Sequence, residues 1–556
     1  GLIDVRNGGR LGGTGTATDD VDVSGTLAPG VAGTPGTLKV EGALDLRTNS
    51  VLEIDLTDAD GDSDRVDVTG DATLANVTVE IVPSPGDYSG TLTYDILSAS
   101  SILQGPDFGI GESFCFFSTD LSIQGGNTLQ LRLSEDLSGL VDRCTDTSNQ
   151  RAVGSALAAV LSDTVLPNIK DSLSTLTSEE VPTALDLMSG EGLAGFQSTR
   201  IATATQFLGT LSQRMRDPFT RDTGPAYPLA HSINGPLMPS LGEGARLDGG
   251  LARSVRTAAA TGRAATPFSF VSMRGESGLG GFLDGFATLA GIEGDGNSND
   301  TDFNLYGTTG GIDWAFADGA LIGAAVGYTR SKLSVTDLAT WGAGDTFQGA
   351  LYAGYATDSF YLAGVARYGY TQMKTRRRIA FGEIFDTAKG DFDGTSISGY
   401  AEVGLASIEL AETLFQPTAG FQYTYIQTDD FTETGAPQLN LGVLTPSVNS
   451  MVSNVGLRVY RAFTMDIEAD IVPELRVRYA HEFGDTARPL AGRFADAATP
   501  PPFSVEAAEI GRDVAIVGAG WTVVGEGSSS LSLHYDVTLN EDILAHAISL
   551  GILIYW

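Results

Sequence analysis

The feature that most constrains this chain is the series of alternating polar and apolar segments in its C-terminal half. Such alternation predicts β-strands with two different faces. We expect twelve strands, at 268–275, 303–316, 320–332, 346–357, 360–376, 394–408, 414–428, 450–462, 471–484, 512–524, 529–539 and 543–556. The links after even-numbered strands are short and those after odd-numbered strands are long, except at the last hairpin near Asn540. An even strand count with this alternation of links is typical of a bacterial outer-membrane β-barrel.

The faces of individual strands favour a barrel in lipid over the alternative, a soluble barrel or sandwich. Alternate residues of the last strand form an apolar face, Ile548, Leu550, Ile552, Ile554 and Trp556. In segment 471–484, Leu475, Val477 and Tyr479 lie on one face, and Glu474, Arg476 and Arg478 lie on the other. Because charges are tolerated only toward a polar interior, we expect the second face to line the lumen, where Arg458 and Glu402 can pair with its residues.

Residues 1–145 predict a different all-β unit. Short alternating runs, such as 37–40, 52–56 and 77–81, are separated by Gly, Asp or Asn turns. Each run is too short to be stable alone, so stacked strands that bury a shared core are the economical arrangement. We therefore expect the end of a β-solenoid, with an ordinary β-sandwich as the alternative.

Residues 146–266 predict a helical linker with a Pro- and Gly-rich insertion. Apolar residues recur at helical spacing in three segments, 149–161, 179–188 and 194–215. Frequent Pro and Gly at 217–250 indicate an irregular insertion, and 251–263 predicts a further helix. The expected organisation is thus a solenoid at 1–145, a linker at 146–266 and a barrel at 267–556.

Composition argues against a nucleic-acid partner. The chain has 33 Lys and Arg against 69 Asp and Glu, a formal net charge of -36, whereas binding to nucleic acid requires a basic surface. No apolar stretch is long enough for a membrane-spanning helix. No signal segment opens the chain, which indicates that it begins inside a longer precursor.

The residues offer little support for an enzyme, a cofactor or a metal site. The His residues are scattered, at His231, His481, His534 and His546. Gly61-Asp62-Ser63 resembles a Ser-hydrolase motif only superficially, because Asp64 follows Ser63. The acidic run 58–64 has oxygen ligands for Ca²⁺, but Ser63 and Thr69 stand where a calcium loop needs Gly and Glu. We favour a solvated turn there, and predict no catalytic, cofactor or metal residues.

Several motifs resemble those of type Va autotransporters along nearly the whole chain. The segments that carry the resemblance are Gly25–Gly30, Gly36–Val40, Ser63–Gly70 and Tyr94–Ala99 for the passenger end, Ser148–Val153 and Ala184–Glu191 for the helical segment, Leu211–Arg216 for the linker helix, and Arg378–Phe381, Phe392–Gly394 and Ala401–Gly404 for the barrel. Trp556 is similar to the family's terminal assembly signal.

The resemblance implies a translocator that is inserted by the barrel-assembly machinery, with periplasmic chaperones, and exports its own passenger to the cell surface. It also implies a helix in the lumen, either 194–216 or 251–263. We favour 251–263, because it adjoins the first strand and has small side chains. The alternatives are a surface adhesin with a retained passenger, or a passive porin. A closed barrel has no free strand edges, so a monomer is expected.

Two further groups of residues remain from the sequence. Cys115 and Cys144 are the only cysteines, and an even pair in an exported protein predicts a disulfide, with two buried thiols as the alternative. The dense basic run consists of Lys374, Arg376, Arg377 and Arg378. It predicts either contact with lipopolysaccharide phosphates in the outer-membrane lipid or pairing with acidic loops such as 429–430.

Overall fold

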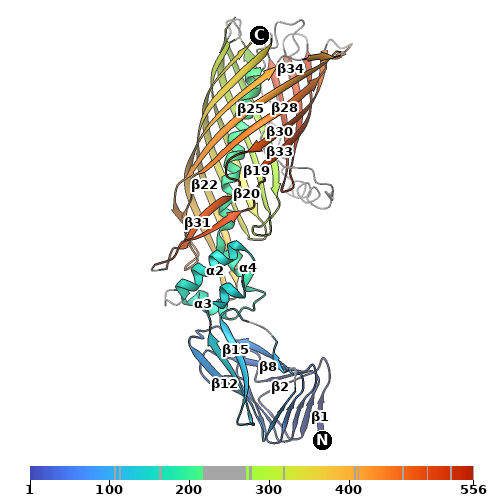
Figure 1. The fold of residues 1–556 in the computed structure, drawn as a ribbon, viewed down its shortest axis with the longest axis vertical. Helices are drawn as coiled ribbons and strands as arrows, with labels where there is room; N and C mark the ends of the chain where they lie inside the picture. Colours follow the sequence, from blue (N-terminus) through green and yellow to red (C-terminus); the bar gives the residue numbers. More distant parts are fainter. Residues whose placement is uncertain are drawn as a thin grey trace.

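The computed structural model has three parts that follow one another along its long axis (Figure 1). A solenoid carries the N-terminus at one end, a group of helices follows, and a barrel carries the C-terminus at the other end (Figure 1). The structure describes residues 1–105, 108–111, 114–161, 166–216, 271–274, 279–316, 320–357, 359–405, 408–410, 412–461, 463–465, 469–497, 499–525 and 529–554.

The N-terminal part is a solenoid with three sheets of short strands, and the solenoid prediction is confirmed. The first sheet contains β1 (Leu2–Val5), β4 (Asp20–Val23), β7 (Leu44–Leu46), β10 (Ala72–Leu74) and β13 (Ile102–Gln104). The second contains β2 (Arg10–Gly13), β5 (Thr26–Pro29), β8 (Val51–Leu56), β11 (Thr78–Pro83) and β14 (Gly109–Ile110). The third contains β3 (Thr16–Ala17), β6 (Thr37–Val40), β9 (Arg65–Val68), β12 (Thr91–Ser98), β15 (Phe117–Gln124) and β16 (Thr128–Glu135).

Equivalent apolar residues of successive solenoid turns lie in register. In the first sheet, Val21 pairs with Leu44 and Leu44 with Ala72, and all three side chains are buried. These strands pair in parallel, whereas β16 pairs antiparallel with both β12 and β15. The hairpin therefore changes the strand direction at the C-terminal end of the third sheet and covers an edge that would otherwise be open to another chain.

Six helices connect the solenoid to the barrel within the described residues. They are α1 (Gly139–Asp142), α2 (Ser148–Leu161), α3 (Pro167–Ser174), α4 (Val181–Ser189), α5 (Glu191–Ala194) and α6 (Phe196–Arg216). Gly190 separates α4 from α5 and has a left-handed backbone, with a φ of 71°, which glycine adopts without a Cβ clash. The helices expected at 149–161, 179–188 and 194–215 correspond to α2, α4 and α6. The helix expected at 251–263 lies outside the described residues.

Twelve strands of the described chain form the closed antiparallel barrel that was predicted. They are β18 (Leu279–Ile292), β19 (Thr301–Ala315), β20 (Ala320–Val335), β21 (Thr340–Ala356), β22 (Phe360–Phe381), β23 (Ile384–Leu405), β25 (Thr413–Thr428), β28 (Val448–Tyr460), β30 (Ala469–Glu482), β33 (Asp513–Gly525), β34 (Ser529–Leu539) and β35 (Ile543–Ile554). Three short strands extend this sheet, β17 (Val271–Arg274), β24 (Ile408–Leu410) and β29 (Phe463–Met465).

The expected position of the first barrel strand was wrong. The pattern placed it at 268–275, but the described residues of that region, 271–274, form the short strand β17, which runs parallel to β35. The barrel closes instead between β18 and β35, where Phe286 pairs with Ser549 and Ile292 with Ile543. The sequence of β18 (LGGFLDGFATLAGI) is rich in Gly and apolar residues. It therefore lacks the strict polar and apolar alternation by which the other strands were recognised.

The predicted faces of the barrel strands are confirmed in β30. Leu475, Val477 and Tyr479 point outward and are 61%, 56% and 48% exposed, whereas Glu474 and Arg476 are buried inside. Apolar residues thus face the surroundings of the barrel, and charges face its interior.

The two longest links of the barrel contribute a small sheet that sequence analysis missed. It contains β26 (Phe431–Thr432), β27 (Leu441–Leu444), β31 (Arg488–Phe494) and β32 (Phe503–Ala507). Its apolar side chains, including Leu441 and Phe494, belong to the same buried cluster as Leu185 of α4. We call the barrel end that carries this sheet the mouth, and the opposite end, where β19 and β20 meet, the short-turn end.

Cys115 and Cys144 form a disulfide with a sequence separation of 29 residues. It joins the segment before β15 to the segment after α1, and both residues are buried. Closing a loop of this length contributes about 3 to 4 kcal/mol in the chain-entropy description. We therefore expect the double variant C115A/C144A to lose amide-exchange protection in β15 and β16 while barrel strands such as β22 keep theirs. Hydrogen exchange on the full chain in detergent measures this, and unchanged protection in β15 and β16 would contradict the expectation.

Candidate functional site

The lumen of the barrel contains α6, which runs from the mouth toward the short-turn end (Figure 1). Near the mouth, Gln197 donates a hydrogen bond to the carbonyl of Pro489 in β31. Near the other end, Arg214 pairs with Asp313 of β19. The expectation that 251–263 fills the lumen is therefore not supported, because the alternative segment, 194–216, contains the helix found there.

One side of α6 is apolar and packs against the wall from β18 to β23. The residues that share this cluster are Phe207, Leu208, Leu211 and Met215 of the helix and Phe282, Leu321, Ala325, Ala350, Tyr352, Tyr361, Ala363, Val365 and Tyr400 of the wall. Glycines in the wall provide room for the large rings. A Cβ at Gly327 would lie 2.6 Å from the Phe207 ring, and one at Gly342 would lie 2.4 Å from the Phe196 ring. The abundance of Gly in the strands thus has a specific packing role here.

The other side of α6 is polar and hydrogen-bonds to β23 and β25. Arg200 donates to the carbonyl of Thr395 at 2.7 Å and to that of Gln427 at 3.1 Å. Gln422 donates to Thr205 at 2.7 Å. These bonds satisfy polar groups that would be costly to bury without partners.

A buried ion pair anchors the C-terminal turn of α6. The guanidinium of Arg214 donates two hydrogen bonds to Asp313, at 2.7 and 3.2 Å, and Tyr352 donates a third at 3.1 Å. The Arg214 and Asp313 side chains are almost fully buried. The pair was not anticipated, since Asp313 lies in a Gly-rich strand that gave no sign of its partner.

The structure places all four predicted lumen charges on the inner wall, and two pairings of the expected kind form. Arg478 lies 3.8 Å from Glu402, and Arg458 pairs with Glu474. Arg476 also binds Glu474 and pairs with Asp536 at 2.7 Å. Asp536 was not among the residues that the sequence placed in the lumen.

Glu402 is the predicted lumen residue that contacts α6. It accepts hydrogen bonds from Tyr361 at 2.7 Å, Tyr400 at 2.6 Å and Ser212 of α6 at 3.4 Å. Arg458 and Arg476 both bind Glu474 in the wall. Glu402 therefore supports the helix, and Arg458 and Arg476 take part in a network that braces the wall.

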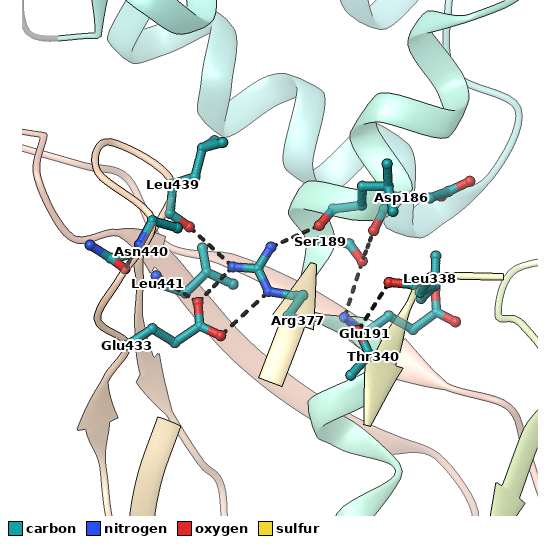
Figure 2. A network of polar contacts seen from close by, with 12 residues as sticks. Asp186, Ser189, Glu191, Leu338, Thr340, Arg377, Glu433, Leu439, Asn440 and Leu441 are labelled. Carbon is teal, nitrogen blue, oxygen red and sulfur yellow. Dashed lines mark hydrogen bonds and ion pairs between the residues drawn. The ribbon is translucent and has the colours of Figure 1, made fainter. Parts of the chain in front are cut away.

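A second buried network holds the helices on the mouth, as Figure 2 shows. Arg377 of β22 donates to Glu433 at 2.6 Å, to the carbonyl of Leu187 at 2.7 Å and to that of Leu439 at 3.0 Å. Glu433 in turn accepts a hydrogen bond from the backbone of Leu441. One guanidinium thus links α4, the barrel wall and the small sheet.

Burial of Arg377 excludes lipid contact by this member of the basic run, while its pair with Glu433, in the link after β25, is of the other predicted kind, a pairing with a nearby acidic loop. Strand alternation turns Arg377 into the mouth, where it is 1% exposed, so it cannot contact a lipid outside the barrel. Lys374, Arg376 and Arg378 are exposed on the outer face. Lys374 pairs loosely with Asp391 at 3.5 Å, rather than with the loop at 429–430.

Asn149 of α2 and Glu191 of α5 form a third contact between helices and mouth. Asn149 donates to Glu191 at 3.0 Å and to the carbonyl of Glu506 in β32 at 2.9 Å. Glu191 also accepts a hydrogen bond from the backbone of Asn299 at 2.6 Å. Burial raises the pKa of Glu191 to about 7, against the opposing effect of these donors.

The remaining predicted residues add no site. Trp556 lies outside the described residues. His534 contacts Arg476 in the wall network, whereas His481 contacts Asp513. In the described part of the chain, no three His, Cys, Asp or Glu residues are grouped so that they could hold a metal ion. Among the helices that the structure describes, none is both long and apolar enough to cross a membrane.

A closed barrel with an apolar outer face, a charged inner face and a helix in its lumen defines a transmembrane barrel of the outer-membrane class. The sequence model of the autotransporter β-domain matches residues 281–536. This part of the chain is an autotransporter β-domain, and it forms the outer-membrane translocator. The translocator is not itself catalytic.

One similar protein is an extracellular serine protease of Serratia marcescens, 26% identical over 260 residues. The match covers 46% of this chain and 24% of the protease, so the chain spans about a quarter of that relative's length. The match lies in the β-domain region.

Solved structures of autotransporter barrels are also similar. The translocator domain of NalP from Neisseria meningitidis is 16% identical, with a TM-score of 0.40, and the match covers 50% of this chain and 88% of that one. The β domain of BrkA from Bordetella is 16% identical, with a TM-score of 0.36, and the match covers 49% of this chain and 98% of that one. The transport unit of AIDA-I from Escherichia coli is 12% identical, with a TM-score of 0.37, and the match covers 50% of this chain and 90% of that one.

Substitution of Arg377 tests the network at the mouth. In R377M, Glu433 is left buried without its cation, and breaking such a pair typically costs about 3 to 5 kcal/mol. We expect a lower melting temperature in detergent and faster amide exchange in α4. The matched control is R378M, one residue along the same strand but exposed, which should behave like wild type. Equal melting of both variants would contradict the assignment.

The raised pKa of Glu191 predicts a pH dependence of the contact between α5 and the mouth. A carboxyl whose pKa is raised on folding stabilises the folded state fully below its unfolded pKa and loses that contribution as the pH rises through the folded value. We therefore expect exchange protection in α2 and α5 to fall between about pH 4.5 and pH 7, by up to about 1.4 kcal/mol per pH unit. E191Q should remove this dependence, and the exposed E179Q should not. A slope of the same size in E191Q would refute the assignment.

Proposed function

We propose that this translocator exports its own N-terminal solenoid and then keeps α6 in the lumen as a plug. The observation that carries the proposal is the course of the chain, which runs from the solenoid through α1 to α5 at the mouth and then through the lumen as α6 (Figure 1). In outer-membrane barrels short turns face the periplasm, so the mouth faces the cell surface. The solenoid would then lie outside the cell.

The dimensions of α6 agree with this role. At 1.5 Å per residue, its 21 residues span about 31 Å, which is close to the hydrocarbon thickness of about 30 Å. A helix of this length, held by Arg200 near the mouth and Arg214 near the short-turn end, is suited to remain in the lumen after export. A plugged lumen does not suit the porin alternative.

Folding of the solenoid provides a direction for export. Each new turn adds buried contacts to the previous one, as Leu44 does to Val21, so every folded turn outside opposes return of the chain. The disulfide and the hairpin β15–β16 would complete this unit next to the mouth. Residues 1–145 act, in this proposal, as the part whose folding drives passage.

Partners follow from the membrane location. The barrel-assembly machinery and periplasmic chaperones would insert the barrel, with Trp556 as part of the assembly signal. Outer-membrane lipid and lipopolysaccharide would surround it. The closed sheet leaves the barrel without open edges, which supports a monomer.

A specific observation favours the adhesin alternative, in which the solenoid stays attached to the barrel. Leu56 and Leu133 of the solenoid, Leu185 of α4 and Leu441 of the mouth belong to one buried cluster. Separation would expose this apolar surface to water. We therefore propose that residues 1–194 remain on the mouth, while any activity of a longer passenger is outside this proposal.

Protease shaving of intact cells tests export. Antibodies to 1–145 and to the barrel should show loss of the first and survival of a barrel fragment. A protected solenoid in cells with a folded barrel would overturn the proposal.

Variants test the role of solenoid folding. Deletion of 60–140, or V66D in the buried core, should reduce surface exposure at least several-fold, because the folded turns no longer oppose return. The exposed K39Q is the matched control and should be exported normally. Normal surface display of V66D would contradict the proposal that folding of the solenoid drives export.

A further inference from the structure

The geometry points to a binding site for a phosphorylated glycolipid of the outer leaflet on the outer face of the barrel, in a pocket lined by Lys332, Trp341, Lys374 and Arg376. The pocket has a volume of about 440 Å³. This inference rests on the proposed orientation of the mouth toward the cell surface, but not on the export mechanism. The pocket differs from the basic run predicted from the sequence: it does not include the buried Arg377, and it adds Lys332 and Trp341.

The register of three strands builds the pocket. Lys332 of β20 pairs with Ala343 of β21, and Ala343 pairs with Lys374 of β22. Neighbouring strands are about 4.8 Å apart, so the two lysines flank a small side chain at a separation of about 10 Å. Their long side chains can converge over Ala343 on a single anion, while Ala343 leaves the floor of the pocket open.

The next row of the same strands supplies a wall and a third cation. Trp341 pairs with Arg376 across β21 and β22. The Trp341 side chain is 41% exposed and lines the pocket. An indole beside cationic groups provides a flat surface for a sugar ring, and Arg376 provides planar donors for phosphate oxygens.

The three cations of this pocket outnumber the one carboxylate that lines it, Asp302 of β19. Within the described residues, no carboxylate lies within 4.0 Å of the charged groups of Lys332 or Arg376, and Lys374 has one partner, Asp391, at 3.5 Å with both side chains largely exposed. The ammonium of Lys332 lies 5.8 Å from the centre of the Tyr306 ring. In a chain with a net charge of -36, three outward cations beside a single lining carboxylate form a locally positive pocket that attracts an external anion.

The height of the pocket on the barrel matches a lipid headgroup. Outward aromatic rings that include Tyr328 and Phe347, whose centres are 5.4 Å apart, mark the interface toward the mouth. Lys332 is four residues beyond Tyr328 in β20, a distance of about 13 Å along the strand. Headgroup phosphates would lie at this level, with acyl chains against the aromatic and aliphatic wall below. A lipid-linked phosphate therefore fits this position better than free phosphate.

Lipid binding by the purified full chain in detergent tests the inference. The probes are fluorescent lipopolysaccharide, the same lipid after enzymatic removal of its phosphates, and inorganic phosphate as a competitor. We expect the double variant K332Q/K374Q to bind intact lipopolysaccharide at least 10-fold more weakly than wild type, and the dephosphorylated lipid to bind wild type with similarly weak affinity. K39Q, on the distant solenoid, is the control and should bind like wild type.

Two results would overturn the site. One is equal affinity of the wild type and K332Q/K374Q for intact lipopolysaccharide, with the two proteins showing the same melting temperature. The other is displacement by inorganic phosphate at concentrations comparable to those of the lipid, which would indicate an anion site without lipid selectivity. Protease shaving of the same variant separates this inference from export, because lost lipid binding with normal surface exposure concerns the pocket alone.

Discussion

Closure of the barrel by the pairing of β18 with β35 is the constraint on which the rest of the structure depends. Hydrocarbon offers no hydrogen-bond partners, so every backbone group of the wall must be satisfied by a neighbouring strand. A closed wall of twelve strands necessarily encloses an interior. That interior must be filled with side chains, water or another segment of the chain, and here α6 fills part of it.

The asymmetry of α6 follows from this requirement. Its apolar side packs on the wall that contains Gly327 and Gly342, whose missing side chains admit aromatic rings. Its polar side satisfies Arg200 and Thr205 with groups of β23 and β25. The opposite wall neutralises its own charges around Glu474. The helix is therefore matched to one half of the barrel rather than held by a uniform surface.

The mouth connects the barrel to the solenoid through a continuous core. Links that would otherwise be loose form a sheet, and this sheet packs on the helices that follow the solenoid. Arg377 and Asn149 add polar bonds whose geometry selects one placement of those helices. Apolar contact provides most of the stabilisation, and the buried polar bonds specify how the parts fit.

The sequence by itself determined an antiparallel barrel with eleven of its twelve strands in place, the orientation of their faces and the solenoid, because two-residue alternation and short repeats are local properties. It also indicated the inward position of Arg476 and the possible pairing of Cys115 with Cys144. Only the tertiary structure decided that α6 occupies the lumen, that β18 begins the barrel, and that Arg377 meets Glu433. These outcomes depend on strand register and on loops that are far apart in the sequence but meet in space. A local pattern carries no information about which distant residue completes a contact.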